Sequence, residues 1–219
     1  GRGRIGAIYA DLGSYYLRMF GVTAGYHRYF SHRAFKLNRF WQFVLAFLAQ
    51  TSAQKGALWW AAHHRDHHLH SDRTTDIHSP VHEGFWWSHL GWILSDEYDH
   101  YDPKRIADFS RFPELVWLNR YHLVPTVAYG AAVWWAGGAF AFVWGFIVAT
   151  VLLYHGTFLI NSLAHIWGTR RFATPDESRL FGSGVNRAVR VAALDDEVLD
   201  DAVPAEIVEV ALLSEEYKA

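Results

Sequence analysis

The stretch Ala139–Ile160 reads AFAFVWGFIVATVLLYHGTFLI and decides the fold. Its 22 residues include no Asp, Glu, Lys or Arg, so only His155 can carry a charge. A helix needs roughly 20 apolar residues to cross a bilayer, and this one has no polar stripe that would face water on a soluble protein. We therefore expect a membrane-spanning helix; the alternative is a soluble helical protein with a very apolar core.

The sequence just before this stretch predicts a helical hairpin. Leu123–Ala136 forms a first, shorter apolar arm, and Gly137-Gly138 separates it from the second arm. Pro125 lies within the first arm, where membrane helices tolerate proline. Two crossings return the chain to its starting side, so Asn161 and His165 should face the same compartment as the histidines that precede the hairpin.

Two further apolar segments lie nearer the N-terminus. Gly6–Ala24 is mostly apolar but is interrupted by Asp11 and Arg18, which suits the inner end of a membrane helix. Phe40–Ala49 is strongly apolar for only ten residues, so it is too short to cross and should lie in the interface or pack inside the protein. The histidines on either side of it should then share one side of the membrane. The predicted fold class is all-α, an integral membrane helical protein.

Basic residues flank these segments on the side that carries the histidines. They are Arg28, Arg33, Lys36, Arg39, Arg170 and Arg171. Positive charge gathers on cytoplasmic loops. The sequence therefore predicts a multi-pass membrane protein with a histidine-rich cap on the cytosolic side.

Charge and histidine are unevenly distributed along the chain. All fourteen histidines lie at or before His165. Residues 181–219 hold nine acidic and three basic residues, whereas residues 1–180 hold thirteen acidic and seventeen basic ones. We expect a membrane core over 1–180 and a divergent acidic tail over 181–219, either a short amphipathic helix or disordered. Because the chain has no cysteine, any metal must take nitrogen and oxygen ligands.

Histidines recur at spacings that suit a metal site. His27 and His32 form an H-x4-H pair, and residues 64–68 form an H-x2-H-H group. Positions i, i+3 and i+4 share one face of a helix, so His64, His67 and His68 can converge on a common centre. Asn161 and His165 are spaced i, i+4 and should project together, at the end of the hairpin.

The number of histidines predicts two metal ions. Imidazole binds iron, zinc, copper and nickel, and spacing does not choose among them. Six or more histidines exceed the tetrahedral demand of one zinc, and iron with open positions is suited to O2 chemistry. Taken alone, each cluster is instead typical of solvated surface histidines. For the remaining histidines a structural or surface role is favoured: His63, His70, His78, His82, His89, His100, His122 and His155.

These motifs resemble those of one enzyme family. Gly21–Arg33 (GVTAGYHRYFSHR) resembles the first histidine box of the membrane-bound stearoyl-CoA (acyl-CoA Δ9) fatty acid desaturases, bacterial type, and Trp59–His68 resembles the second. Asp76–Pro80 resembles the loop after the second box. Asn161–Gly168 (NSLAHIWG) and Arg171–Thr174 resemble the family's segment after the fourth membrane helix. The resemblance covers roughly residues 15–179.

The resemblance implies a di-iron enzyme of a bacterial inner membrane. The implied iron ligands are His27, His32, His64, His67, His68 and His165, with Asn161 binding through a water and Trp60 near an acyl tunnel. The implied reaction inserts a cis double bond, Δ9 by the resemblance, into a saturated acyl chain with O2 and two electrons. Implied partners are a fatty acyl-CoA or acyl-lipid, membrane lipids and an external electron donor (a ferredoxin, cytochrome b5 or a reductase), with no nucleic acid.

One departure from the family is clear. After the D-x-S-R element the family continues to a third box of the H-N-x-H-H kind, but residues 180–219 contain no histidine. The expectation is a frameshift, fusion or truncated gene and an incomplete, inactive iron centre. Two alternatives remain open: a related membrane hydroxylase or alkane monooxygenase, and a non-catalytic metal-binding remnant.

Overall fold

The computed structural model describes residues 12–168. The chain divides into two compact units, Gly1–Gly182 and Ser183–Ala219, and all that follows concerns the first. The predicted tail, the Arg170–Arg171 pair and the start of the Gly6–Ala24 segment lie outside the described residues. Within residues 12–168 every regular element is a helix, which confirms the all-α prediction.

The described chain opens on a helix over residues 12–20 that continues as the π-helix η1 (Gly21–Ser31). A Cβ placed on Gly21 would lie 2.9 Å from the Ala49 Cα, so glycine allows η1 to pack closely against α2 (Arg39–Gln50). The Asn38 side chain caps α2 by accepting a hydrogen bond from the Trp41 backbone N–H at 3.0 Å. α2 has 12 residues, fewer than the roughly 20 that a helix needs to cross a bilayer, as expected from the apolar segment Phe40–Ala49.

Arg18, which interrupts the first apolar segment, is fully buried. Its guanidinium donates to Thr150 Oγ1 at 2.5 Å and to the Phe146 carbonyl at 3.4 Å, and it lies over the Tyr129 ring. The positive charge is therefore enclosed by polar and aromatic partners from the hairpin. This contact ties the N-terminal helix to the hairpin.

The second histidine box lies on α3 (Ala57–His70), which packs against η1. Tyr26 stacks on Trp60 across that contact with ring centroids 5.3 Å apart. A series of short helices follows: α4 (Pro80–Glu83), η2 (Trp87–Gly91), α5 (Trp92–Leu94), η3 (Asp96–Tyr98), η4 (Pro103–Ile106), α6 (Ala107–Ser110) and α7 (Pro113–Arg120).

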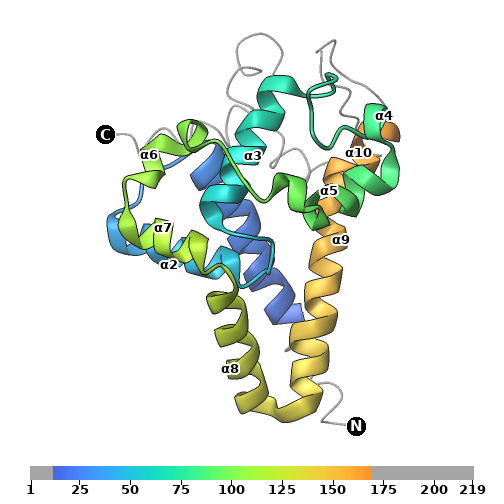
Figure 1. Ribbon diagram of the computed structural model, residues 1–219. Coiled ribbons are helices and arrows are strands. Elements are labelled where there is room, and N and C mark those ends of the chain that lie inside the picture. Colours follow the sequence, from blue (N-terminus) through green and yellow to red (C-terminus); the bar gives the residue numbers. More distant parts are fainter. Residues whose placement is uncertain (1–11, 169–219) are drawn as a thin grey trace, which may run out of the picture. The chain divides into compact units, whose positions relative to one another are not determined.

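The predicted hairpin is present. α8 (Leu123–Ala141) is followed by η5 (Phe142–Val148), α9 (Ala149–Asn161) and α10 (Leu163–Ile166). The chain reverses at Gly138, whose φ of 65° and ψ of −162° suit glycine, and the two arms lie side by side (Figure 1). Across the described residues, one helical run, Leu123–Ile166, is long and apolar enough to cross a membrane, with a peak mean hydropathy of 2.1 and only 17% of that window buried.

The main core lies between η1, α2, α3 and α7, where the side chains of Tyr26, Phe30, Leu58, Leu115 and Leu118 are fully buried. A second, smaller hydrophobic core comprises Trp59, Trp92, Ile93 and Phe158 and joins α3, α5 and α9. Figure 1 shows α3, α4 and α10 gathered at the end of the hairpin opposite its turn. The two cores therefore fix the histidine-bearing helices around that end.

Candidate metal centre

Four histidines from two helices meet at their ring nitrogens. The Nε2 atom of His32 lies 3.1 Å from that of His27 and 3.2 Å from that of His64, and the Nε2 atoms of His64 and His68 are 2.9 Å apart. The ligand atoms of all four lie within 4.8 Å of one another. We call these residues the first cluster.

The backbone explains why His27 and His32 face one another. At five residues apart they would diverge by about 140° on an α-helix, but a π-helix aligns residues i and i+5. η1 has this wider winding, and the His32 backbone N–H donates to the His27 carbonyl at 3.1 Å. His64 and His68 need no such device, because residues i and i+4 are neighbours on the α-helix α3.

The first cluster fits a metal cation. A neutral imidazole carries one N–H, so four converging Nε2 atoms cannot all satisfy each other by hydrogen bonding. Two ligands about 2.1 Å from one ion and at right angles to each other lie about 3 Å apart, close to the spacings observed. Burial and the neighbouring histidines lower the pKa of His64 well below its ordinary value, which keeps the ring in the neutral, metal-binding form.

His67 belongs to a different group. Its ring centroid is 6.3 Å from that of His64, and its ligand atoms lie with those of Asp76 and His78. Residues at i+3 and i+4 flank the i position by about 60° and 40° on opposite sides, so His67 turns away from His68. The second-box histidines were expected to converge on one centre; in the structure their side chains contribute to two adjacent groups. We call His67, Asp76, His78 and His165 the second cluster.

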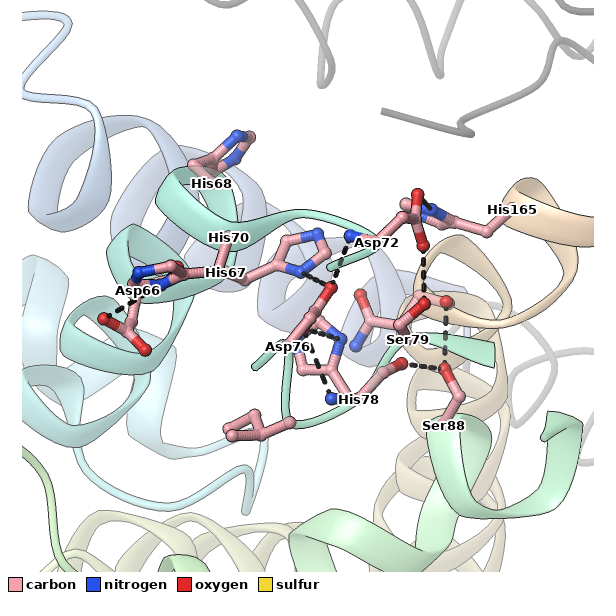
Figure 2. A network of polar contacts seen from close by, with 12 residues as sticks. Asp66, His67, His68, His70, Asp72, Asp76, His78, Ser79, Ser88 and His165 are labelled. Atoms are coloured by element: carbon pink, nitrogen blue, oxygen red, sulfur yellow. Dashed lines mark hydrogen bonds and ion pairs between the residues drawn. The ribbon is translucent and has the colours of Figure 1, made fainter. Parts of the chain in front are cut away.

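Carboxylates orient two histidines of the second cluster, His67 and His165. His67 Nδ1 lies 2.9 Å from Asp76 Oδ2, and His165 Nδ1 lies 2.9 Å from Asp72 Oδ2 (Figure 2). Each contact commits Nδ1, so Nε2 is the nitrogen that each ring can offer to a metal ion. The two rings approach to 5.7 Å between centroids. His67 and His165 are thus brought together from segments far apart in the sequence.

The two aspartates are themselves held by the loop after α3. Asp76 accepts hydrogen bonds from the backbone N–H groups of Asp72 at 3.0 Å and His78 at 3.3 Å. Burial by itself would raise the pKa of Asp76, but the hydrogen bond and charge of His67 outweigh it, so the net pKa is lowered and the carboxylate is ionised. Asp72 adopts a φ of 55° and accepts from Ser79 Oγ at 2.7 Å.

His78 was assigned from the sequence to a structural or surface role, and the structure excludes the surface. The residue is 3% exposed, and its ring lies 4.2 Å from that of His67. Burial, with the neighbouring His67, lowers the pKa of His78 to about 3, so the ring is neutral. Asp72, Asp76 and His78 are the site residues that the sequence reasoning missed. The signal was present in the D-x-H motif that follows the second box.

Asn161 and Trp60 both line a pocket beside the clusters. The full lining is Trp60, His64, His78, Trp92, Ile93, Thr157, Phe158 and Asn161. Trp60 stacks on His64, with ring centroids 4.8 Å apart. The pocket is small, about 20 Å³, and one histidine of each cluster, His64 and His78, borders it together with aromatic and aliphatic side chains.

The histidines nearest to the clusters have structural partners. His63 Nε2 contacts the Tyr98 carbonyl at 3.2 Å, and His70 Nδ1 contacts the Asp66 carbonyl at 3.0 Å. His89 and His155 contact each other at 3.0 Å. These partners agree with the structural role expected for them.

Comparison with known proteins identifies relatives of this chain by sequence. The sequence profile of the fatty acid desaturase family matches residues 7–191. The chain is 35% identical over 159 residues to an sn-1 stearoyl-lipid 9-desaturase of Anabaena variabilis, covering 72% of this chain and 58% of that protein. It is 34% identical over 165 residues to an sn-2 palmitoyl-lipid 9-desaturase of Nostoc sp. (strain 36), covering 73% and 57%.

A plant protein shows the same similarity. The Delta-9 acyl-lipid desaturase 2 of Arabidopsis thaliana is 38% identical over 162 residues, covering 73% of this chain and 52% of that protein. The chain therefore spans little more than half the length of the curated relatives it matches.

Proposed function

Because this chain belongs to the fatty acid desaturase family, we propose that it is the core of a membrane-bound desaturase that inserts a cis double bond into a saturated acyl chain. One observation carries the proposal: His64 of the first cluster and His78 of the second border one small pocket, which aromatic and aliphatic side chains also line. An acyl chain that reaches this pocket would lie beside metal-binding nitrogens, where the aromatic side chains limit the access of water.

Two iron ions suit these clusters. His27, His32, His64 and His68 would hold the first, and His67 and His165 would hold the second, with Asn161 binding through a water. Bound iron activates O2 for attack on an unactivated C–H bond. The second position has fewer ligands among the described residues, and residues 180–219 offer it no histidine. We therefore infer that the first position binds iron more tightly than the second.

The reaction balances with an external electron donor. Two hydrogen atoms leave adjacent carbons of the acyl chain, and O2 takes up these hydrogens with two electrons and two protons to form two waters. The donor supplies the electrons, from a ferredoxin, cytochrome b5 or a reductase. The chain's own part is positional: Trp60 and Phe158 bound the acyl chain, while Asp72 and Asp76 fix the histidine rings.

The substrate is a fatty acyl group carried on a lipid or on CoA. Three relatives are named for acyl-lipid substrates and for position 9, which supports a Δ9 acyl-lipid reaction here. A membrane position fits such a substrate. We propose a multi-pass position in a bacterial inner membrane, which the exposed, apolar run Leu123–Ile166 supports only as far as one membrane-crossing segment. The basic residues Arg28, Arg33, Lys36 and Arg39 near the histidines favour the cytoplasm for that end.

Product analysis tests the proposal. The protein would be purified in lipid, loaded anaerobically with Fe(II) and given O2, reduced ferredoxin with its reductase, and a stearoyl- or palmitoyl-lipid. Mass spectrometry of the released acyl chains should show an alkene that is absent when His64→Ala replaces the wild type and present with the control His100→Ala, which alters an exposed histidine outside both clusters.

Other products would decide between the alternatives. An alcohol in place of the alkene would identify a hydroxylase of the same histidine-box class. Absence of product together with fewer than two irons per chain would support an inactive remnant with an incomplete centre.

A further inference from the structure

Two buried polar residues outside the proposed ligand set lie next to the second cluster. Ser88 and His89 are adjacent on η2 (Trp87–Gly91), and their exposed fractions are 0% and 3%. Buried hydroxyl and imidazole groups need hydrogen-bond partners. The partners of this pair are the segments that carry the second cluster.

Ser88 joins two of these segments. Its hydroxyl contacts the carbonyl oxygen of His78, and it lies 3.1 Å from the carbonyl oxygen of Asn161 (Figure 2). The first carbonyl belongs to the loop that holds Asp76, and the second belongs to the end of α9, four residues before His165. One hydroxyl therefore bridges the two sides of the second cluster.

His89 holds the residue at which α9 ends. Its Nδ1 lies 2.9 Å from Ser162 Oγ, and its Nε2 lies 3.0 Å from His155 Nδ1. Because Ser162 Oγ donates its own proton to the Phe158 carbonyl at 2.9 Å, it must accept from His89 Nδ1–H. His89 Nε2 is then the acceptor for His155 Nδ1–H. The donors and acceptors form one directed chain.

The held residue sets the direction of His165. Ser162 separates α9 from α10 (Leu163–Ile166), and its φ of −102° and ψ of −67° depart from regular helical values. A change in the backbone at this position would move the His165 ring relative to His67. The hydrogen bond from His89 fixes the Ser162 side chain at that break.

We propose that Ser88 and His89 form a brace that positions the second cluster, holding the Asp76–His78 loop and the Asn161–His165 segment at the separation that a metal ion requires. Both are positioning residues, because neither offers an atom to the metal. This inference rests on the proposed function for the identity of the ligands, and it adds the element that aligns them.

The first test needs no metal. Hydrogen exchange of the full chain in lipid would be followed by mass spectrometry for peptides covering residues 72–80 and 158–166. Ser88→Ala should raise exchange about tenfold in both peptides, because Ser88 contacts a carbonyl group in each. His89→Phe should raise exchange in the 158–166 peptide, which contains its partner Ser162. The control Ser52→Ala removes an equally buried hydroxyl, bonded to the Ala49 carbonyl at 2.6 Å, and should leave both peptides unchanged.

The second test is an anaerobic Co(II) titration read by ligand-field absorption. In Ser88→Ala the weaker class of site should lose about 10- to 100-fold in affinity, the range for residues that support metal ligands. The tighter class should stay within about threefold. His89→Phe should weaken the same class of site. Ser88→Thr keeps the hydroxyl and should recover most of the Ser88→Ala loss, and His89→Asn keeps a donor near the position of Nδ1 and should recover most of the His89→Phe loss.

The outcomes separate the two proposals. Unchanged exchange in both peptides, or equal weakening of both classes of site with no recovery in the conservative variants, would overturn the brace. If the wild type binds only one Co(II), the two-metal function fails, and the exchange experiment still decides whether the brace exists.

Discussion

The first and second clusters lie at the same end of the molecule but are built in different ways. The first takes all four histidines from η1, its C-terminal boundary and α3, two helices that pack directly on each other. The second combines a helix, an irregular loop and the end of the hairpin. Local helix geometry therefore determines most of the first cluster, whereas the second depends on long-range hydrogen bonds.

This difference has an energetic consequence. Ligands on packed helices are held by burial of apolar surface, which is spread over many side chains. Ligands held by single hydrogen bonds lose their alignment when one bond is removed. We expect the second cluster to be sensitive to substitutions that the first tolerates, and four predictions test that expectation.

The largest effect is expected for His64→Ala. His64 Nε2 lies within 3.2 Å of both His32 and His68, so its loss opens the centre of the first cluster. Affinity for the tighter metal should fall by at least about 100-fold, or about 2.7 kcal/mol. Iron content and metal titration measure it, with His100→Ala as control. Retention of the tighter site would show that the first cluster is not a metal site.

Next is Asp76→Asn, which should weaken the second site selectively. The amide loses the charge that orients His67, and we expect about 10- to 100-fold weaker binding at the weaker site only. Asp66→Asn is the matched control, since Asp66 pairs with Arg105 at 2.8 Å away from both clusters. Equal loss at both sites would remove the distinction between the clusters.

Gly21→Ala should disturb the first cluster through packing. The added methyl group would meet the Ala49 backbone at 2.9 Å and force η1 away from α2, at about 1–2 kcal/mol of stability. Thermal unfolding in detergent measures this change. Gly13→Ala is the control, because nothing lies within 4 Å of its added Cβ; a similar loss there would show that close packing is not the cause.

The smallest effect is expected for Asn38→Ala. It removes the N-cap of α2 and should lower the free energy of unfolding by about 1 kcal/mol without altering either metal affinity. The same unfolding and titration experiments apply. A change at either metal site would mean that the start of α2 is coupled to the histidines.

Much of the fold could be predicted from local patterns. The charge-free stretch at 139–160, the glycine pair before it and the short Phe40–Ala49 segment correspond to η5 with α9, the reversal at Gly138 and α2. Each feature depends on composition within a short window. Because the α2 segment is too short to cross a membrane, the first-box and second-box histidines were also expected on the same side, and four of them form one group in the structure.

The sequence by itself determined which residues can bind metal and which segments are apolar enough to enter a membrane, because those properties belong to single side chains and short runs. Only the tertiary structure decided how the ligands divide. The π-winding that aligns His27 with His32 is visible only in the backbone hydrogen bonds of the folded chain. The turn of His67 toward Asp76 and the approach of His165 depend on hydrogen bonds between residues up to 93 positions apart. Such contacts form only when the helices are assembled, so spacing along the chain does not encode them.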